Sequence, residues 1–354
     1  MKMIKTFIIA PTVLFLALVL SVPVRAEFVR GIFTTGAETF DTISAMGFNL
    51  AICRTETAEL ESAKRLGLKL IPQWFGDDTK SFERIAEFGD DSRIAAWFPF
   101  DEPDIYHISQ EIVEGKITRL RKYSNKPVFL TVFTPSRYAD FFPYADFCGI
   151  TPYPIGSNPN EIRMEVVGQF SKIARVVSGA KPLYIFVPVF FQRPWQYRAP
   201  TALELHNIVY QALTSAPDGI LFFIWKIGGL DNVIWNLTDR PDLMKEIEII
   251  NHELITLDGV LTAGTDASSE ITSASNPLVY YRLVEFGGEY YLFVANPMPR
   301  ELQFEIGFDF VPDATEIMFG SGVKIRNTDS HNRIALTMNK FGHSVIKICN
   351  NNQE

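Results

Sequence analysis

Hydrophobic runs and amphipathic stretches alternate along most of the chain, and the spacing of the apolar positions predicts which element each one forms. Short, continuous apolar runs are typical of strands buried on both faces, as in a parallel sheet. Apolar residues that recur every three or four positions predict helices. The predicted strands are 28–34, 48–53, 68–75, 94–100, 127–133, 147–153, 183–190 and 220–225.

A helical segment is predicted after each of these strands. The best-marked helix follows Thr201, because Thr201 and Glu204 form a capping box ahead of apolar residues at helical spacing. Another helix is expected to begin with Asn158 as its N-cap. Two buried faces are predicted: Ile108, Ile112 and Ile117 in helix 105–122, and Val166, Val167, Phe170, Ile173, Ala174 and Val177 in the helix after Asn158.

Eight strands in strict alternation with helices predict a closed TIM (β/α)8 barrel, an α/β fold. A doubly wound open sheet is the rival fold, but it usually has fewer strands and a glycine-rich first turn. The amino-acid composition changes at residue 257, where a Ser/Thr/Gly-rich segment precedes short runs of alternating apolar and polar residues separated by turns. This pattern predicts a small antiparallel β-sandwich. The expected domains are therefore a barrel over 27–256 and a sandwich over 257–354.

The first 26 residues have the features of a secretory signal peptide. Lys2 and Lys5 precede an apolar run, and the segment ends on the small residue Ala26. We therefore expect cleavage after Ala26, a secreted or periplasmic protein, and no stable membrane insertion afterwards. An uncleaved membrane anchor is the alternative, against which Pro11 and Pro23 argue because they interrupt a short apolar run.

Charge and composition narrow the classes of partner. The chain has 33 basic and 41 acidic residues, and residues 1–26 contain three of the basic ones and no acid, so the mature chain has 30 against 41, a net charge of −11. Such an acidic surface disfavours nucleic acid and anionic membranes as partners. The three cysteines lie in apolar runs, as buried thiols do, and the five histidines have no metal-ligand spacing. No phosphate-binding loop is present, so neither a cofactor nor a metal is expected.

Two adjacent carboxylates follow the strand 94–100. Asp101 and Glu102 stand at its carboxyl end, and Pro103 cannot continue the hydrogen-bond ladder. A barrel places its catalytic groups at this end of the strands. Cleavage of a glycoside needs a carboxylic acid that protonates the leaving oxygen, usually with a second carboxylate opposite. Glu102 is therefore the expected acid, although either residue could instead cap the next helix.

The ends of the other strands carry aromatic and polar side chains that suit a sugar. The C–H faces of sugars pack on aromatic rings, and their hydroxyls bond to amide, carboxylate and guanidinium groups. Pairing of Arg54 with Glu56 and simple packing of the tryptophans are the alternatives. Glu204 and Asp146 are set aside as a helix cap and as a residue of the opposite barrel face. The expected substrate-binding residues are Arg54, Gln73, Trp74, Tyr153, Gln192, Trp195 and Trp225.

Three segments resemble secreted bacterial barrel proteins of the glycoside hydrolase clan A type with a C-terminal β-sandwich: Trp97-Phe98-Pro99-Phe100-Asp101-Glu102-Pro103, Ile150-Thr151-Pro152-Tyr153-Pro154, and 184–192 leading to Arg198-Ala199-Pro200-Thr201. The resemblance implies Arg54 at the end of strand two, Glu102 as acid/base, Tyr153 near the end of strand six and Trp225 as the floor of the sugar site. The sequence departs from the pattern where Asp101 replaces an Asn, and where Phe190-Phe191-Gln192 replaces the nucleophilic Glu.

The sequence thus predicts a secreted glycoside hydrolase-like protein acting on a poly- or oligosaccharide, with Glu102 as general acid. Its second acid would be Asp101, Asp77 or Asp78. The alternative is a catalytically incomplete carbohydrate-binding barrel, or pseudoenzyme, which the missing glutamate favours. A third class is a purely structural envelope protein.

Overall fold

The computed structural model describes residues 27–349 except 35, 55, 74–75, 77–78, 90, 157, 159–160, 193–197, 226–233, 236 and 327–330. The predicted signal peptide therefore lies outside the described residues. Within the described part of the chain, no helix is both long and apolar enough to cross a membrane.

Eight parallel strands form the predicted TIM barrel. They are β1 (Val29–Phe33), β2 (Leu50–Cys53), β3 (Lys69–Pro72), β4 (Trp97–Phe100), β5 (Val128–Val132), β6 (Phe147–Ile150), β7 (Leu183–Pro188) and β9 (Gly219–Phe223). They pair in the order β3-β2-β1-β9-β7-β6-β5-β4. Isolated bridges from Leu70 to Ile94 and from Gln73 to Phe98 connect the two end strands and close the ring. The predicted fold class is confirmed.

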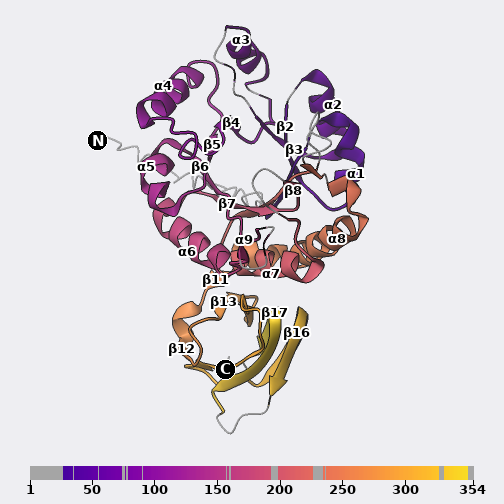
Figure 1. Cartoon of the computed structure of the whole chain (residues 1–354), viewed down its shortest axis with the longest axis vertical. Helices are drawn as coiled ribbons and strands as arrows, with labels where there is room; N and C mark the ends of the chain where they lie inside the picture. The colour runs from indigo at the N-terminus through magenta and orange to yellow at the C-terminus, as the bar shows by residue number, and fades with distance from the viewer. Residues whose placement is uncertain are drawn as a thin grey trace, which may run out of the picture.

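The helices surround the strands, with the strand ring inside (Figure 1). They are α1 (Phe40–Ala45), α2 (Thr57–Leu66), α3 (Thr79–Phe88), α4 (Gln110–Leu120), α5 (Tyr138–Phe141), α6 (Val166–Ser178), α7 (Ala202–Leu213), α8 (Pro241–Thr256) and α9 (Asp258–Ala263). One apolar core lies between strands and helices, and a second lies inside the barrel around Phe98, Phe129 and Phe186. Because the strands are covered on both sides, they are apolar without alternation.

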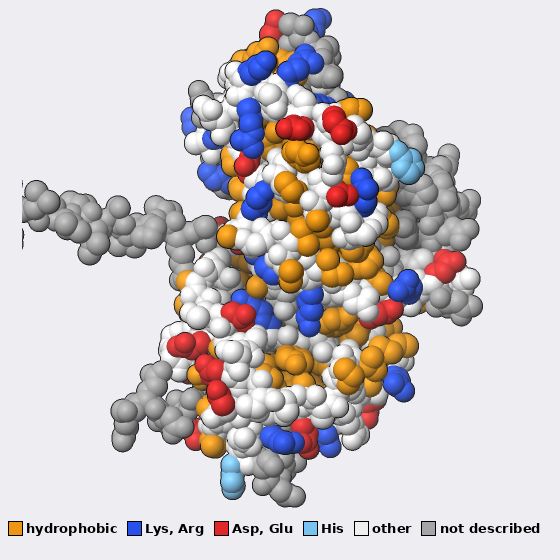
Figure 2. Space-filling view, turned by 90° about the vertical axis from the view of Figure 1, so that its left-hand side faces the viewer, with side chains coloured by type: hydrophobic (Ala, Val, Ile, Leu, Met, Phe, Trp, Pro, Cys, Tyr) orange, Lys and Arg blue, Asp and Glu red, His pale blue; other side chains and the backbone are white. Residues whose placement is uncertain are grey.

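For two helices, the prediction of which residues are buried is partly wrong. Ile173 and Val177 of α6 are 43% and 37% exposed, and Ile112 of α4 is 59% exposed. The buried face of α6 carries small residues instead, among them Ser171 and Ala174, which allow a close approach to its neighbours. On the side of the molecule shown in Figure 2, hydrophobic side chains accordingly lie among interspersed charges of both signs.

The predicted start of that helix is also wrong. Helix α6 begins at Val166 rather than after Asn158. The carbonyl of Asn158 instead accepts a hydrogen bond from the N–H of Glu161, in a turn beside the isolated bridge from Ile155 to Ile162. Asn158 therefore does not cap the helix, because it belongs to a turn that extends the connection after β6.

The C-terminal part forms the predicted small antiparallel domain, as a curled sheet around its own core. Its strands are β11 (Thr265–Asp266), β12 (Ile271–Ala274), β13 (Tyr280–Phe286), β14 (Glu289–Ala295), β15 (Leu302–Phe308), β16 (Ala314–Arg326) and β17 (Arg333–Cys349). The first part of β17 pairs with β15 and the last part with β14. Phe341 lies between these two parts, and its φ of 54° is in the left-handed region.

Helix α7 lies between the barrel and this sheet, as Figure 1 shows. Every residue from Glu204 to Leu213 is buried, because one face packs on barrel strands and the other on β14 and β17. The Nδ2 of Asn207 donates to the carbonyl of Asn296 at 2.9 Å, and Gln211 donates to the Oδ1 of Asn207 at 2.7 Å. A helix buried on all sides therefore carries paired polar residues on the face toward the sheet.

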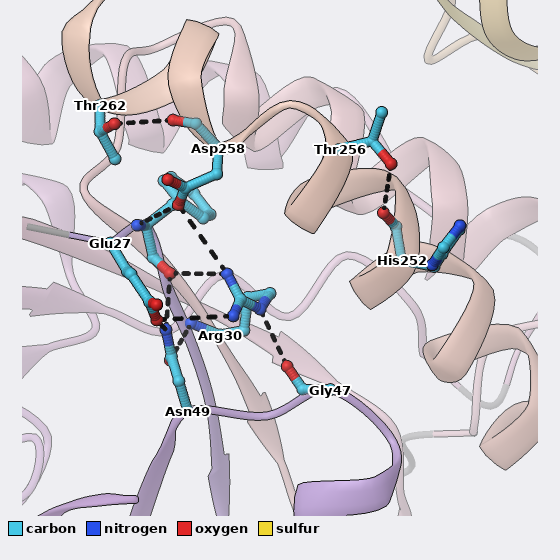
Figure 3. Close-up of polar contacts among 9 residues, drawn as sticks. Glu27, Arg30, Gly47, Asn49, His252, Thr256, Asp258 and Thr262 are labelled. Carbon is cyan, nitrogen blue, oxygen red and sulfur yellow. Dashed lines mark hydrogen bonds and ion pairs between the residues drawn. The ribbon is translucent and has the colours of Figure 1, made fainter. Parts of the chain in front are cut away.

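A buried arginine holds the amino end of the barrel together (Figure 3). The Nε of Arg30 donates to the carbonyl of Gly47 at 2.9 Å, and its guanidinium lies near the carboxylates of Glu27 and Asp258. Asp258 also accepts the N–H of Phe28 at 2.8 Å, which ties α9 to the start of the first strand. This is the end of the barrel opposite Asp101 and Glu102, and its contacts serve stability.

Candidate active site

The strand that leads to the two carboxylates contains a bulge. Trp97 pairs with Val128 and Phe100 with Leu130, so β4 contains one more residue than β5 between these two pairs. Phe98 belongs to the core inside the barrel, whereas the ring of Phe100 lies under the Nζ of Lys116 on α4. Bulges of this kind redirect the side chains that follow them. Here the bulge lies directly before Asp101, whose carboxyl group accepts a hydrogen bond from Thr131 on β5.

Glu102 is buried at this mouth in an uncommon backbone conformation. It is 8% exposed, and its φ of 46° lies in the left-handed region, which few residues other than glycine adopt. Its N–H donates to the Oγ1 of Thr131 at 3.0 Å, and its Oε1 accepts a hydrogen bond from the hydroxyl of Thr151. The hydroxyl of Thr131 in turn donates to Asp101 Oδ1 at 2.6 Å. The buried Thr131 thus contacts the carboxyl group of Asp101, and the buried Thr151 contacts that of Glu102.

Burial and like charge raise the pKa values of both acids. Desolvation, followed by the charge of Asp101, raises the pKa of Glu102 to about 8, although the hydrogen bond from Thr151 opposes the shift. Desolvation also raises the pKa of Asp101, against the hydrogen bond from Thr131. Near neutral pH Glu102 therefore carries a proton, the state that a general acid needs.

The loop after these acids contributes two further side chains. Asp104 accepts the N–H of Phe133 at 3.2 Å and that of Thr134 at 2.8 Å, so it caps the end of β5. Tyr106 is 61% exposed, and burial together with the charges of Asp101 and Glu102 raises the pKa of its hydroxyl. The helix predicted from residue 105 begins only at Gln110, because this turn comes first.

Aromatic rings line the mouth at the ends of β5, β6, β7, β9 and β1. Phe133 lies 5.9 Å from Tyr153, Tyr153 lies 5.8 Å from Phe190, and Phe223 lies 5.3 Å from both Phe190 and Phe33, between ring centroids. All but the buried Phe190 are partly exposed. Phe190 stands after β7, where the resemblance implies a nucleophilic glutamate. This ring cannot act as a nucleophile.

Two of the predicted substrate-binding residues, Arg54 and Gln73, come together. They line a cavity of about 430 Å³ whose other lining residues include Glu56, Arg84 and Trp97. Glu56 pairs with Arg84 at 3.0 Å rather than with Arg54. Among the described residues, the charges that shift the pKa of Glu102 are all acidic. Arg54 and Gln73 follow β2 and β3, so their cavity lies at the ends of these two strands.

The other predicted site residues are placed as follows. Trp225 lies after β9 and is 5% exposed. Trp74, Trp195, Asp77, Asp78 and the side chain of Gln192 lie outside the described residues. Glu204 forms the predicted capping box with Thr201 and pairs with Arg198, which confirms its structural role.

Metal-ligating side chains and thiols are a further feature of the described part of the chain. It contains no group of three or more His, Cys, Asp or Glu side chains that could hold a metal ion. Cys53 and Cys148 are buried, Cys349 is partly buried, and none of the three forms a disulfide bond within the described residues.

Sequence reasoning located the carboxyl pair but missed Thr131, Thr151 and Tyr106. A usable signal existed for Thr131, because a single hydroxyl residue interrupts the otherwise apolar strand 127–133. Thr151 stood in the segment quoted for the resemblance, without an assigned role. Tyr106 was missed because a helix was predicted over its position.

No protein-family model matches the chain, and no curated protein matches it. Solved structures of glycoside hydrolases share its fold. A GH30 endoxylanase from Clostridium papyrosolvens has a TM-score of 0.53 at 11% identity, over 92% of this chain and 97% of that one. An α-amylase from Geobacillus thermoleovorans, complexed with acarbose, has a TM-score of 0.55 at 12% identity, over 92% and 98%. A β-galactosidase from Halorubrum lacusprofundi has a TM-score of 0.55 at 12% identity, over 66% and 59%. At these identities the likeness establishes the fold alone.

Proposed function

We propose that this protein is a secreted glycoside hydrolase-like barrel that acts on a poly- or oligosaccharide, with Glu102 as the general acid. One observation carries the proposal: a buried carboxyl group with a pKa raised to about 8 lies at the mouth of a (β/α)8 barrel. Such a carboxylic acid stays protonated near neutral pH and can protonate a leaving oxygen. The fold shared with glycoside hydrolases agrees with this chemistry.

In the proposed reaction Glu102 donates its proton to the glycosidic oxygen, the bond from that oxygen to the anomeric carbon breaks, and water adds to this carbon. The proton of the water passes to a second carboxylate, for which Asp101, Asp77 and Asp78 are the candidates. An inverting attack needs carboxyl groups about 6.5–9.5 Å apart, which favours the loop after β3 over the adjacent Asp101. The proposed substrate contacts are Arg54, Gln73, Trp74, Tyr153, Gln192, Trp195 and Trp225.

The second candidate function is carbohydrate binding without hydrolysis. It is favoured by Phe190, which fills the position of the expected nucleophile and packs between Tyr153 and Phe223. A ring of aromatic side chains binds sugars whether or not the chemistry is complete.

The test is a glycan array on the mature protein, followed by hydrolysis assays on every glycan bound. We expect Glu102→Gln to keep binding and to lose hydrolysis by about 100-fold or more, as for the loss of a general acid. Glu114→Gln, an exposed change on α4, is the matched control and should hydrolyse like the wild type. Hydrolysis unchanged in Glu102→Gln would exclude the acid role, and binding without hydrolysis by the wild type would establish the second candidate.

Export is the remaining part of the proposal. It is supported by the basic start, the apolar run and the small residue at Ala26. Protein recovered from the periplasm or the medium should have the intact mass of a chain that begins at Glu27. Recovery of the uncut chain in a membrane fraction would contradict it.

A further inference from the structure

We propose that Thr131 and Thr151 are positioning residues that fix the two carboxyl groups and leave Oε2 of Glu102 as the oxygen that carries the transferable proton. The inference rests on the proposed function for its consequence in catalysis, but the arrangement itself can be tested without any substrate. Neither threonine would touch the sugar in order to act.

Thr131 is fully buried, and its one hydroxyl serves both acids. It accepts the N–H of Glu102 at 3.0 Å and donates to Asp101 Oδ1 at 2.6 Å. A hydroxyl has a single hydrogen, so the bond to the carboxylate commits that hydrogen and leaves a lone pair for the N–H. The same contact holds Glu102 in its left-handed conformation.

Thr151 selects which oxygen of the Glu102 carboxyl group carries the proton. It is 3% exposed and donates to Oε1. A protonated carboxyl group has one hydroxyl oxygen and one carbonyl oxygen, and only the oxygen without the proton is a good acceptor. Since Oε1 accepts, the proton is placed on Oε2, which forms no hydrogen bond with the described residues and is the oxygen available to a substrate.

The barrel brings the two threonines together through a close contact below them. Thr131 pairs with Gly149 across β5 and β6, and Thr151 follows Gly149 by two positions on the same face. A Cβ on Gly149 would meet the ring of Phe129 at 2.7 Å, so only glycine allows this approach. Both hydroxyls therefore lie directly above the aromatic core of the barrel, at the level of the carboxyl pair.

The experiment follows the Glu102 carboxyl group by carbon-13 NMR in protein labelled at glutamate, with Glu102→Gln identifying the resonance. The wild-type signal should titrate near pH 8. Thr151→Val keeps the shape and removes the donor that favours the charged form, so its midpoint should rise by about one pH unit. Thr151→Ser should restore the wild-type midpoint. Thr131→Val should raise the midpoint of Asp101, followed in the same way with labelled aspartate.

Thr214→Val is the matched control, because this buried hydroxyl donates to the carbonyl of Gln211 at the end of α7, away from the acids. It should leave both titrations unchanged. A folded Thr151→Val variant, or Thr151→Ala if valine does not fold, with the wild-type Glu102 midpoint would overturn the role of Thr151. An unchanged Asp101 midpoint in Thr131→Val would overturn that of Thr131. Failure of the wild type to hydrolyse any glycan would refute the proposed function alone, since the titrations need no substrate.

Discussion

At the scale of single residues, the chemistry of this barrel depends on how Glu102 is held. The sequence places two acids side by side, and burial makes it costly to ionise both. Glu102 has a left-handed backbone, is little exposed, and has a hydroxyl donor on one carboxyl oxygen. These features constrain both its conformation and its protonation. Strained and buried acids of this kind cluster at functional sites.

The raised pKa of Glu102 predicts a dependence of stability on pH. The folded protein keeps this proton up to about pH 8, whereas the ordinary value is 4.5. The folded state therefore binds more protons between these values, and the free energy of unfolding should fall as pH rises through that window, by up to about 1.4 kcal/mol per pH unit. Urea denaturation at a series of pH values should show this slope reduced in Glu102→Gln.

Glu114→Gln, the exposed control, should run parallel to the wild type across the same window. Parallel curves for the wild type and Glu102→Gln would show instead that the proton on Glu102 is lost near its ordinary pKa in the folded protein.

At the scale of elements, helix packing depends on small residues as much as on apolar ones. Helix α6 meets the C-terminal sheet at Gly168, where an added Cβ would lie 2.6 Å from the ring of Tyr280. The hydroxyl of Tyr280 donates to the carbonyl of Glu165 at 2.9 Å, which fixes the ring against the start of the helix. The apolar Ile173 and Val177 remain outside because the closest approach uses a different face.

Two glycine-to-alanine changes separate packing from helix propensity. Gly168→Ala should destabilise the protein by about 1–3 kcal/mol, because the methyl group overpacks the contact with Tyr280. Gly115→Ala in α4 meets nothing within 4 Å and should stabilise it by up to about 1 kcal/mol. The free energy of unfolding in urea measures both. Equal effects of the two changes would mean that the Tyr280 ring moves aside freely.

At the scale of the whole molecule, barrel and sheet meet through a stacked pair of buried histidines. The rings of His206 on α7 and His343 on β17 lie 4.7 Å apart and nearly parallel. His206 lies between the carboxylates of Glu246 and Glu253, and the hydroxyl of Tyr210 donates to Glu253 at 2.7 Å. Burial, together with His206, lowers the pKa of His343 to about 3.

This interface predicts sensitivity to acid. The folded state keeps His343 neutral down to about pH 3, while the ordinary value is 6.5, so the unfolded state binds more protons between them. The contribution of neutral His343 to stability is complete above pH 6.5. As the pH is lowered through this window, the free energy of unfolding falls by up to about 1.4 kcal/mol per pH unit. His206 and Tyr210 face His343 directly, and Glu246 and Glu253 lie behind His206.

In urea denaturation across that window, His343→Gln should show a smaller loss of stability on acidification than the wild type. His252→Gln changes an exposed histidine on α8 and should behave like the wild type. If His343→Gln and the wild type lose stability in parallel, protonation of His343 does not limit the interface in acid.

The sequence by itself determined the barrel and the position of the carboxyl pair. Apolar runs buried on both faces, alternating with amphipathic stretches, leave few other arrangements, and the carboxyl ends of parallel strands must share one end of the barrel. The capping box of Thr201 and Glu204 was equally local and was predicted correctly. In each case the physical cause acts between residues close in sequence or on a whole strand.

The tertiary structure alone decided how the site is held and what covers each helix. Thr131 meets Asp101 across 30 positions of the chain, and Thr151 meets Glu102 across 49. Periodicity identifies the faces of an element but not the distant side chains that those faces contact. The bulge in β4, the cavity that Arg54 shares with Gln73 and the all-round burial of α7 arise from such contacts. Their energies depend on a distant neighbour that no local pattern specifies, which is why only the folded chain reveals them.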